Sequence, residues 1–178
     1  MLKAFKNELQ GRVQWEQRPN KGGLDYEITE INSDYAYKNL HLEIIPFEVD
    51  HYPVEPAYGY QIKISDTEME KKVVISGDTR KNENLINHAM DADALVHEVF
   101  INLEFDENRM SKKTISNVRD YHTSPKEIGE IAKAANVKKL ILTHFVPPVF
   151  DEDFLTKEIR ESYKGNVIIG EDLLTIEI

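Results

Sequence analysis

The chain of 178 residues contains no cysteine. Disulfide bonds and thiolate metal sites are therefore excluded, and any transition-metal site must be built from histidine, aspartate and glutamate. Nitrogen and oxygen ligands of this kind suit hydrolytic zinc or manganese.

A long apolar run and a cluster of basic residues are also missing. No stretch approaches the ~20 apolar residues that span a bilayer, and the segment from Met1 to Glu8 lacks the apolar core of a signal peptide. These absences favour a cytoplasmic protein without a membrane partner. With 22 Lys and Arg against 32 Asp and Glu, the net charge is −10, which argues against electrostatic binding of nucleic acid.

What the chain does have is 40% apolar residues, enough for the core of one soluble domain or part of one. Periodicity, capping residues and turn residues divide it into alternating elements. We expect a linker over 17–25 and a polar, irregular connection over 102–120. We expect strands over 26–31, 41–49, 57–64, 73–75, 94–96, 139–143, 167–169 and 173–178, and helices over 1–10, 82–90, 124–136 and 152–162.

Candidate functional residues follow several of the predicted strands. The apolar run Val73–Ile75 ends in Ser-Gly and is followed by Asp78, while His51, His97 and His144 follow or end other apolar runs. In layered α/β proteins functional groups gather outside the carboxyl ends of strands, where side chains can converge. A carboxylate and several imidazoles in such places indicate a metal site.

A hydrolytic metal site needs neutral imidazole nitrogens, a carboxylate and one position left for water. His51, Asp78 and His144 supply three such ligands from three strand ends. Each residue taken alone also fits an ordinary role, as a hydrogen-bonded histidine or as a turn aspartate that caps the next helix. The metal hypothesis therefore depends on their joint arrangement.

Three further polar residues have two interpretations each. His122 precedes a helix predicted to start at Ser124, and it can serve as a general acid or merely pack at the helix start. Glu98 can orient a histidine through a ring nitrogen, or be a solvated charge at a strand end. Arg80 can bind a carboxylate or phosphate, or form a structural salt bridge.

Short motifs occur in order from about residue 40 onward. They are Val49-Asp-His51, Pro56-Ala-Tyr-Gly-Tyr-Gln-Ile62, Ser76-Gly-Asp78-Thr-Arg80, Val96-His-Glu98, His122-Thr-Ser-Pro125 and Leu142-Thr-His144-Phe145. Together they resemble the carboxyl-terminal half of the metallo-β-lactamase fold, and the most similar branch is that of the ribonuclease Z and arylsulfatase-like hydrolases.

The resemblance implies a hydrolase with two zinc ions, or manganese in their place. His51 would bind the first zinc, Asp78 would bridge both, and His144 would bind the second. His122 would be the acid for the leaving group, with Glu98 hydrogen-bonded to it. The implied fold is α/β, a four-layer αββα sandwich, of which residues 1–178 would form one domain portion, a mixed β-sheet with covering helices.

The family's His-x-His-x-Asp-His motif is absent from the chain, so about half of the expected ligands are missing. A longer protein, a complementary amino-terminal half on a partner chain, or a non-catalytic relic that dimerises would each account for this. One sheet of a two-sheet sandwich would also leave an apolar face uncovered. We therefore expect self-association or a complementary half as partner.

A second difference between this chain and the family pattern predicts the substrate class. In ribonuclease Z, the resemblance implies an inserted arm between the two strands that precede the bridging aspartate; here Ile62 and Ser76 are joined by a simple hairpin. Together with the charge of −10, this favours a small ester of sulfate, phosphate or a carboxylic acid. The alternative is a ribonuclease Z-like endonuclease that processes the 3′ end of transfer RNA.

Overall fold

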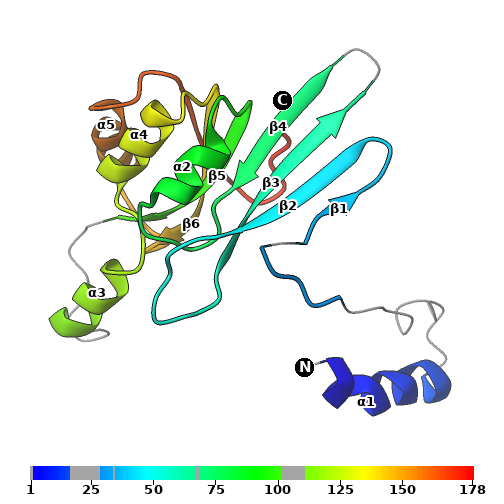
Figure 1. Ribbon diagram of the computed structural model, residues 1–178. Coiled ribbons are helices and arrows are strands. Elements are labelled where there is room, and N and C mark those ends of the chain that lie inside the picture. Colours follow the sequence, from blue (N-terminus) through cyan, green and yellow to red (C-terminus); the bar gives the residue numbers. More distant parts are fainter. Residues whose placement is uncertain (1, 17–28, 34, 67–68, 102–110) are drawn as a thin grey trace. The chain divides into compact units, whose positions relative to one another are not determined.

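The computed structural model describes residues 2–16, 29–33, 35–66, 69–101 and 111–178 (Figure 1). The chain divides into two units, residues 1–31 and residues 32–178. The linker predicted over 17–25 and most of the strand predicted over 26–31 lie outside the described residues, and the described residues 29–31 form no strand.

The first unit contains helix α1 (Leu2–Trp15). This helix was predicted to end at Gly11, which was wrong, because α1 continues through that glycine. Arg12 pairs with Glu8 one turn earlier, with 2.8 Å between Nη2 and Oε1. Such a contact favours the helix, whereas one interior glycine costs only about 1 kcal/mol.

The second unit is built on a sheet of seven strands that neighbour one another in sequence order. They are β1 (Tyr37–Lys38), β2 (Leu42–Glu48), β3 (Tyr58–Ser65), β4 (Glu70–Ile75), β5 (Ala94–Phe100), β6 (Lys139–Val146) and β7 (Asn166–Ile169).

The sheet is mixed, as predicted. Strands β1 to β4 pair antiparallel, and β4 to β7 pair parallel. The predicted hairpin is present, since β3 ends at Ser65 and β4 begins at Glu70. Parallel pairing brings the carboxyl ends of β4, β5 and β6 to one edge of the sheet. The predicted site residues lie at or just beyond this edge.

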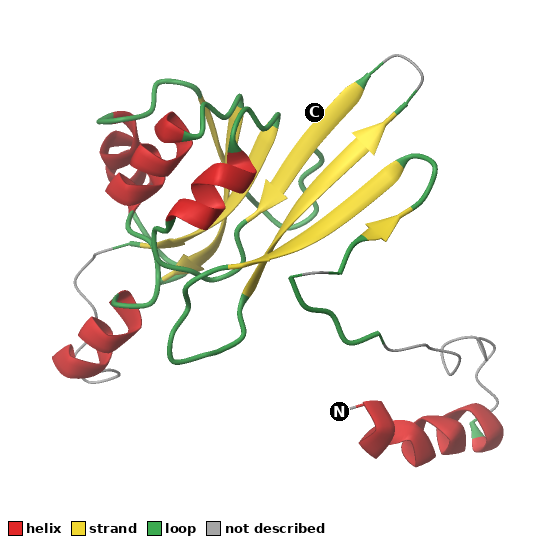
Figure 2. Ribbon diagram, viewed as in Figure 1, coloured by secondary structure: helices red, strands yellow, loops and turns green. Residues whose placement is uncertain are grey.

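Three helices cover one face of the sheet (Figure 2). Each begins at a side-chain cap, namely Asn82, Ser124 and Asp151. The capping box predicted for Ser124 and Glu127 is present. The helices are α2 (Glu83–Ala89), α4 (Pro125–Ala134) and α5 (Glu152–Arg160).

The main core lies between these helices and the sheet. Val74, Leu95 and Leu140 point into it from three neighbouring strands and have no exposed surface. Helices α4 and α5 approach closely at Gly129, where an added Cβ would clash with the Ile159 carbonyl oxygen. Burial of this apolar layer stabilises the strands whose ends carry the site.

The opposite face of the sheet also carries apolar side chains. They form two rows across the strands, because residues paired in register point to the same face. The face is only partly covered, since Ile75 is 36% exposed and Ile64 is 44% exposed. The first row is Ile44, Ile62, Val73 and Ala94, and the second is Tyr60, Ile75, Val96, Ile141 and Ile168.

Two further expectations were wrong. Residues 102–120 were expected to be irregular, but the described part contains helix α3 (Lys112–Arg119), whose first turn is capped by Ser111. Residues 102–110 lie outside the described part. The strand expected over 173–178 is absent: this segment has no regular structure, and Ile176 packs on the apolar second face of the sheet.

Among the described helices, none is both long and apolar enough to cross a bilayer.

Candidate metal centre

Asp78 is positioned by a tight turn that follows β4. The amide of Ser76 still bonds to the Val96 carbonyl of β5 at 2.9 Å, and the chain then leaves the sheet at Gly77. Gly77 has a φ of +62°, and a Cβ there would lie 2.5 Å from the Tyr58 carbonyl oxygen. Only glycine fits this conformation and this contact. The turn therefore directs Asp78 outward from the sheet edge.

His144 is positioned by a bulge in β6. In the pairing with β5, Glu98 lies opposite Thr143 and Val99 lies opposite Phe145, so His144 is the extra residue. Its φ of +47° falls in the left-handed region of backbone conformation, which residues other than glycine rarely adopt. Bulges redirect a side chain at the end of a strand. Here the bulge directs the imidazole toward Asp78.

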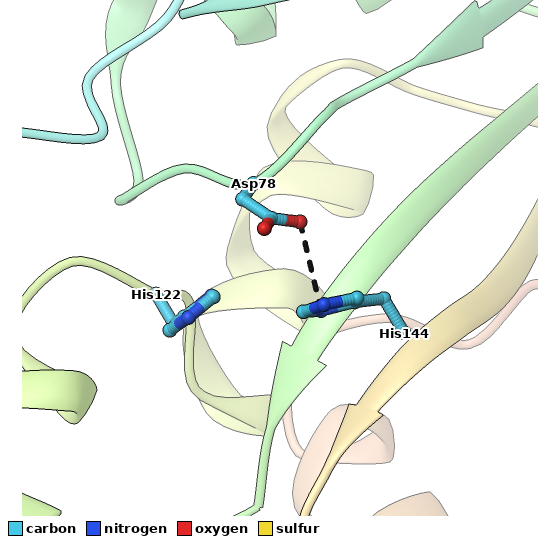
Figure 3. Close-up of side chains that lie close together, drawn as sticks. All are labelled: Asp78, His122 and His144. Atoms are coloured by element: carbon cyan, nitrogen blue, oxygen red, sulfur yellow. Dashed lines mark ion pairs between the residues drawn. The ribbon is translucent and has the colours of Figure 1, made fainter. Parts of the chain in front are cut away.

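Asp78, His122 and His144 form one cluster (Figure 3). One ligand-type atom from each residue lies within 4.8 Å of the others. The Nδ1 atom of His144 lies 3.5 Å from Oδ1 of Asp78, and the rings of His122 and His144 are stacked with 5.7 Å between their centroids. About half of the His144 side chain is exposed, whereas His122 is buried. The cluster is thus accessible from one side.

The donor set of this cluster fits a divalent metal. Two imidazoles and a carboxylate are the ligands that zinc takes in catalytic sites, with bonds of about 2 Å. Ligand atoms of such an ion lie roughly 3.5 Å apart by geometry. The three ligand atoms lie within 4.8 Å of one another, so binding of an ion would require side-chain rotations that draw them together. Asp78, His122 and His144 therefore can hold an ion, and three protein ligands leave the fourth position of a tetrahedral ion for water.

Glu98 contacts His122 on the buried side of the cluster. Both side chains are buried, and Oε1 of Glu98 lies 3.2 Å from Nδ1 of His122. The ring orientation falls short of an aligned hydrogen bond, since Nδ1 has no hydrogen-bond partner among the described residues. The predicted proximity of the two groups is therefore present, without the predicted bond geometry.

His51 lies beside the cluster. Its Nδ1–H donates to the Tyr121 carbonyl oxygen at 2.9 Å, which leaves Nε2 as the nitrogen with a free lone pair. The ring centroid is 5.2 Å from that of His122. The ligand set predicted from sequence was His51, Asp78 and His144; the structure brings His122 into the group of three and places His51 next to it.

Two buried threonines connect the loops of the site, and the sequence analysis did not identify either. Thr79 and Thr123 have no exposed surface, and Thr123 Oγ1 donates to the Thr79 carbonyl oxygen at 2.5 Å. Both backbone amides point at Oε1 of Glu98, at 2.9 Å for Thr123 and 3.4 Å for Thr79. The only signal in the sequence was their position next to His122 and Asp78.

His97 does not belong to the cluster. It is fully buried, and its Nδ1–H donates to the Glu98 carbonyl oxygen at 2.6 Å. Burial lowers the pKa of His97, partly opposed by the charge of Glu98. The imidazole is therefore neutral, and its Nε2 has no hydrogen-bond partner among the described residues.

A cavity of about 420 Å³ adjoins the cluster at His122. Its wall contains three basic residues, Arg80, Lys81 and Arg119, and two acidic ones, Asp120 and Glu127. Lys81 also pairs with Glu130, with 2.6 Å between Nζ and Oε2. In a chain of charge −10, this concentration of basic side chains is local to the site.

The chain is similar to several ribonucleases Z. It is 30% identical over 155 residues to the ribonuclease Z of Mycobacterium bovis BCG Pasteur, which covers 85% of this chain and 53% of that protein. It is 28% identical over 183 residues to the ribonuclease Z of Mycobacterium marinum, covering all of this chain and 62% of that protein. The chain thus spans little more than half the length of these curated relatives. No protein-family profile matches it.

Solved structures agree with this similarity. The metallo-β-lactamase fold protein YhfI from Bacillus subtilis superposes with a TM-score of 0.59 and 26% identity, over 79% of this chain and 52% of that one. Human tRNase Z, short form, superposes with a TM-score of 0.52 and 21% identity, over 80% of this chain and 45% of that one, which shows a shared fold. The mixed sheet with helices on one face matches the metallo-β-lactamase fold of these structures. The chain belongs to the metallo-β-lactamase superfamily.

Proposed function

We propose that this chain forms part of a ribonuclease Z-like, metal-dependent phosphodiesterase. The convergence of Asp78, His122 and His144 at one sheet edge is the observation behind this proposal, because it brings a carboxylate and an imidazole of the kind that bind hydrolytic metals next to a second imidazole that can act as general acid. Similarity to ribonucleases Z supports RNA as the substrate class, so the alternative in the sequence analysis is now better supported than the small ester. Lys81 and Arg119 in the wall of the cavity beside His122 would favour a phosphate-rich substrate.

In this proposal His51, Asp78 and His144 hold the metal. A bound divalent ion supplies Lewis acidity and lowers the pKa of its water ligand. His122 carries a proton on the ring nitrogen that points away from Glu98 and delivers it to the leaving oxygen. The buried Glu98 carboxylate stabilises the His122 imidazolium until this proton is transferred.

The remaining ligands of a two-metal site come from elsewhere in this proposal. The chain spans 53% of the Mycobacterium bovis relative and lacks His-x-His-x-Asp-His. Sequence outside these residues, or a complementary chain, would supply that motif. The partly covered second face of the sheet is the surface on which such a half would pack.

Hydrolysis of a small ester is the second candidate, and the hairpin between β3 and β4 favours it. Strand β3 ends at Ser65 and β4 begins at Glu70. The connection between them is therefore too short to contain an inserted arm that binds RNA. The net charge of −10 points in the same direction, because it weakens long-range attraction of RNA.

The test measures metal content and turnover together. The full chain is loaded with excess zinc and incubated with a precursor transfer RNA that carries a 3′ trailer, and in parallel with p-nitrophenyl esters of phosphate, sulfate and acetate. Asp78→Asn and His144→Ala are compared with His41→Ala, which is an exposed histidine at the opposite end of β2.

Each outcome selects one hypothesis. Endonucleolytic cleavage of the RNA, lost in Asp78→Asn and His144→Ala but kept in His41→Ala, supports the phosphodiesterase. Turnover of p-nitrophenyl esters alone supports the small-ester hydrolase. Bound zinc without turnover indicates a half site that needs its complement, and neither zinc nor turnover supports a non-catalytic relic.

A further inference from the structure

The side chain of Arg80 connects three loops of the candidate metal centre. Its Nη1 donates to Oδ1 of Asp50 at 2.6 Å, and its Nη2 donates to the Tyr52 carbonyl oxygen at 3.2 Å. Its Nε donates to the Asp120 carbonyl oxygen. The backbone amide of Arg80 adds a bond to the Asp50 carbonyl oxygen at 2.7 Å. One residue thus holds the loop before α2 against the two neighbouring loops.

These contacts flank the candidate site residues in sequence. Asp50 and Tyr52 lie on either side of His51, and Asp120 precedes Tyr121, whose carbonyl oxygen accepts the Nδ1–H of His51 at 2.9 Å. Arg80 therefore fixes the distance between the backbone that carries the His51 ring and the carbonyl that orients this ring.

The guanidinium of Arg80 uses three of its five N–H donors within the protein. Its three nitrogens Nε, Nη1 and Nη2 are each bonded to an acceptor on the protein. Of the two interpretations given to Arg80 from the sequence, the structure supports the structural salt bridge. The planar guanidinium of arginine can donate these three bonds in fixed directions, whereas the ammonium of lysine donates from a single nitrogen.

We propose that Arg80 is a positioning residue that holds His51 in a single tautomer, with Nδ1 protonated and the lone pair of Nε2 available for a metal. Hydrogen bonds to the second nitrogen of a ligand histidine commonly fix both its tautomer and its ring orientation. Here the acceptor is the Tyr121 carbonyl, and Arg80 keeps it in place.

The expected effect is local, which separates positioning from general stability. The Arg80 side chain is 31% exposed and that of Asp50 is 51% exposed, so their ion pair contributes little to folding. Loss of the guanidinium leaves the core untouched, yet it frees the loop of His51 from that of Tyr121.

The experiment uses ¹⁵N-histidine NMR of the full chain at about pH 8, where ordinary imidazoles are neutral. The His51 signals are assigned with His51→Gln. Arg80→Ala and Arg80→Lys are compared with Lys81→Ala, the adjacent basic residue, which pairs with Glu130. Thermal unfolding of each variant is followed by circular dichroism.

In the wild-type chain and in Lys81→Ala we expect His51 as the Nδ1–H tautomer alone. In Arg80→Ala and Arg80→Lys we expect its two ring nitrogens to shift toward averaged values, as both tautomers become populated. Arg80→Lys keeps the positive charge, so it decides the question if Arg80→Ala does not fold. Unchanged His51 signals in a folded Arg80 variant, with only a lower unfolding midpoint, overturn the proposal.

Cobalt titration provides a second readout, with an expected loss of about 10-fold to 100-fold in affinity for the Arg80 variants. Retained affinity with averaged tautomers would mean that His51 is oriented by Arg80 but is not a ligand, which overturns the metal part of the proposal. Neither measurement uses RNA or an ester. A failure here is therefore distinguishable from a failure of the proposed phosphodiesterase activity.

Discussion

Oε1 of Glu98 lies 3.2 Å from Nδ1 of His122, and both side chains are buried at the candidate metal centre. The same oxygen accepts the backbone amides of Thr79 and Thr123. One carboxylate oxygen thus organises the loop of Asp78 and the loop of His122 together.

The first prediction concerns this carboxylate. Glu98→Ala leaves two buried amides without an acceptor, and each such loss costs about 1–3 kcal/mol, so we expect a drop of roughly 2–6 kcal/mol in the free energy of unfolding. Glu98→Gln keeps one carbonyl oxygen in place and should lose less. Urea denaturation measures both, and an alanine variant within about 0.5 kcal/mol of wild type would contradict the assignment.

The turn at Gly77 gives the second prediction. Gly77→Ala places a Cβ in a left-handed backbone and against the Tyr58 carbonyl oxygen at 2.5 Å, so we expect a loss of at least about 1–2 kcal/mol. Gly11→Ala is the matched control, because no atom lies within 4 Å of its added Cβ. The control should increase the helicity of α1 and leave the unfolding of residues 32–178 unchanged.

A third prediction follows from the lowered pKa of the buried His97. Below about pH 6.5 the unfolded chain protonates this histidine while the folded chain does not, so the unfolded state binds more protons. The contribution of neutral His97 to stability is therefore complete above about pH 6.5 and decreases as the pH falls.

The measurement compares the unfolding free energies of wild type and His97→Gln at pH 8 and pH 5.5. We expect a smaller difference between the two pH values in the variant. Some pH dependence should remain, because burial also lowers the pKa of His88, followed by the charge of Lys72. An equal pH dependence in both proteins would show that His97 titrates normally.

The apolar second face of the sheet gives the fourth prediction. Ile64 is 44% exposed on this face, so we expect the chain to self-associate in light scattering, and Ile64→Lys to reduce the association. Val149→Lys is the control, since Val149 is 84% exposed in the loop after β6. A wild-type chain that is monodisperse and monomeric would refute the expectation.

Much of the fold was predictable because its signals are local. The Ser124 capping box, the hairpin before Val73 and the apolar run of β4 each depend on residues within about one turn or one strand of each other. Where the local signal was weak, the predictions were wrong: the first helix was expected to end at Gly11, and residues 112–119 were expected to be irregular. Neighbouring residues there compensated for a glycine or supplied a cap.

The sequence by itself determined which side chains are available for chemistry, and that most of them follow apolar strands. Only the tertiary structure decided which of them meet. His144 reaches Asp78 through a bulge whose register depends on pairing between β5 and β6, and His122 joins them from a loop more than 40 residues after Asp78. The contacts of Arg80 with Asp50 and Asp120 likewise join residues 30 and 40 positions apart. Strand order and register set these distances, and neither is a property of any short stretch of sequence.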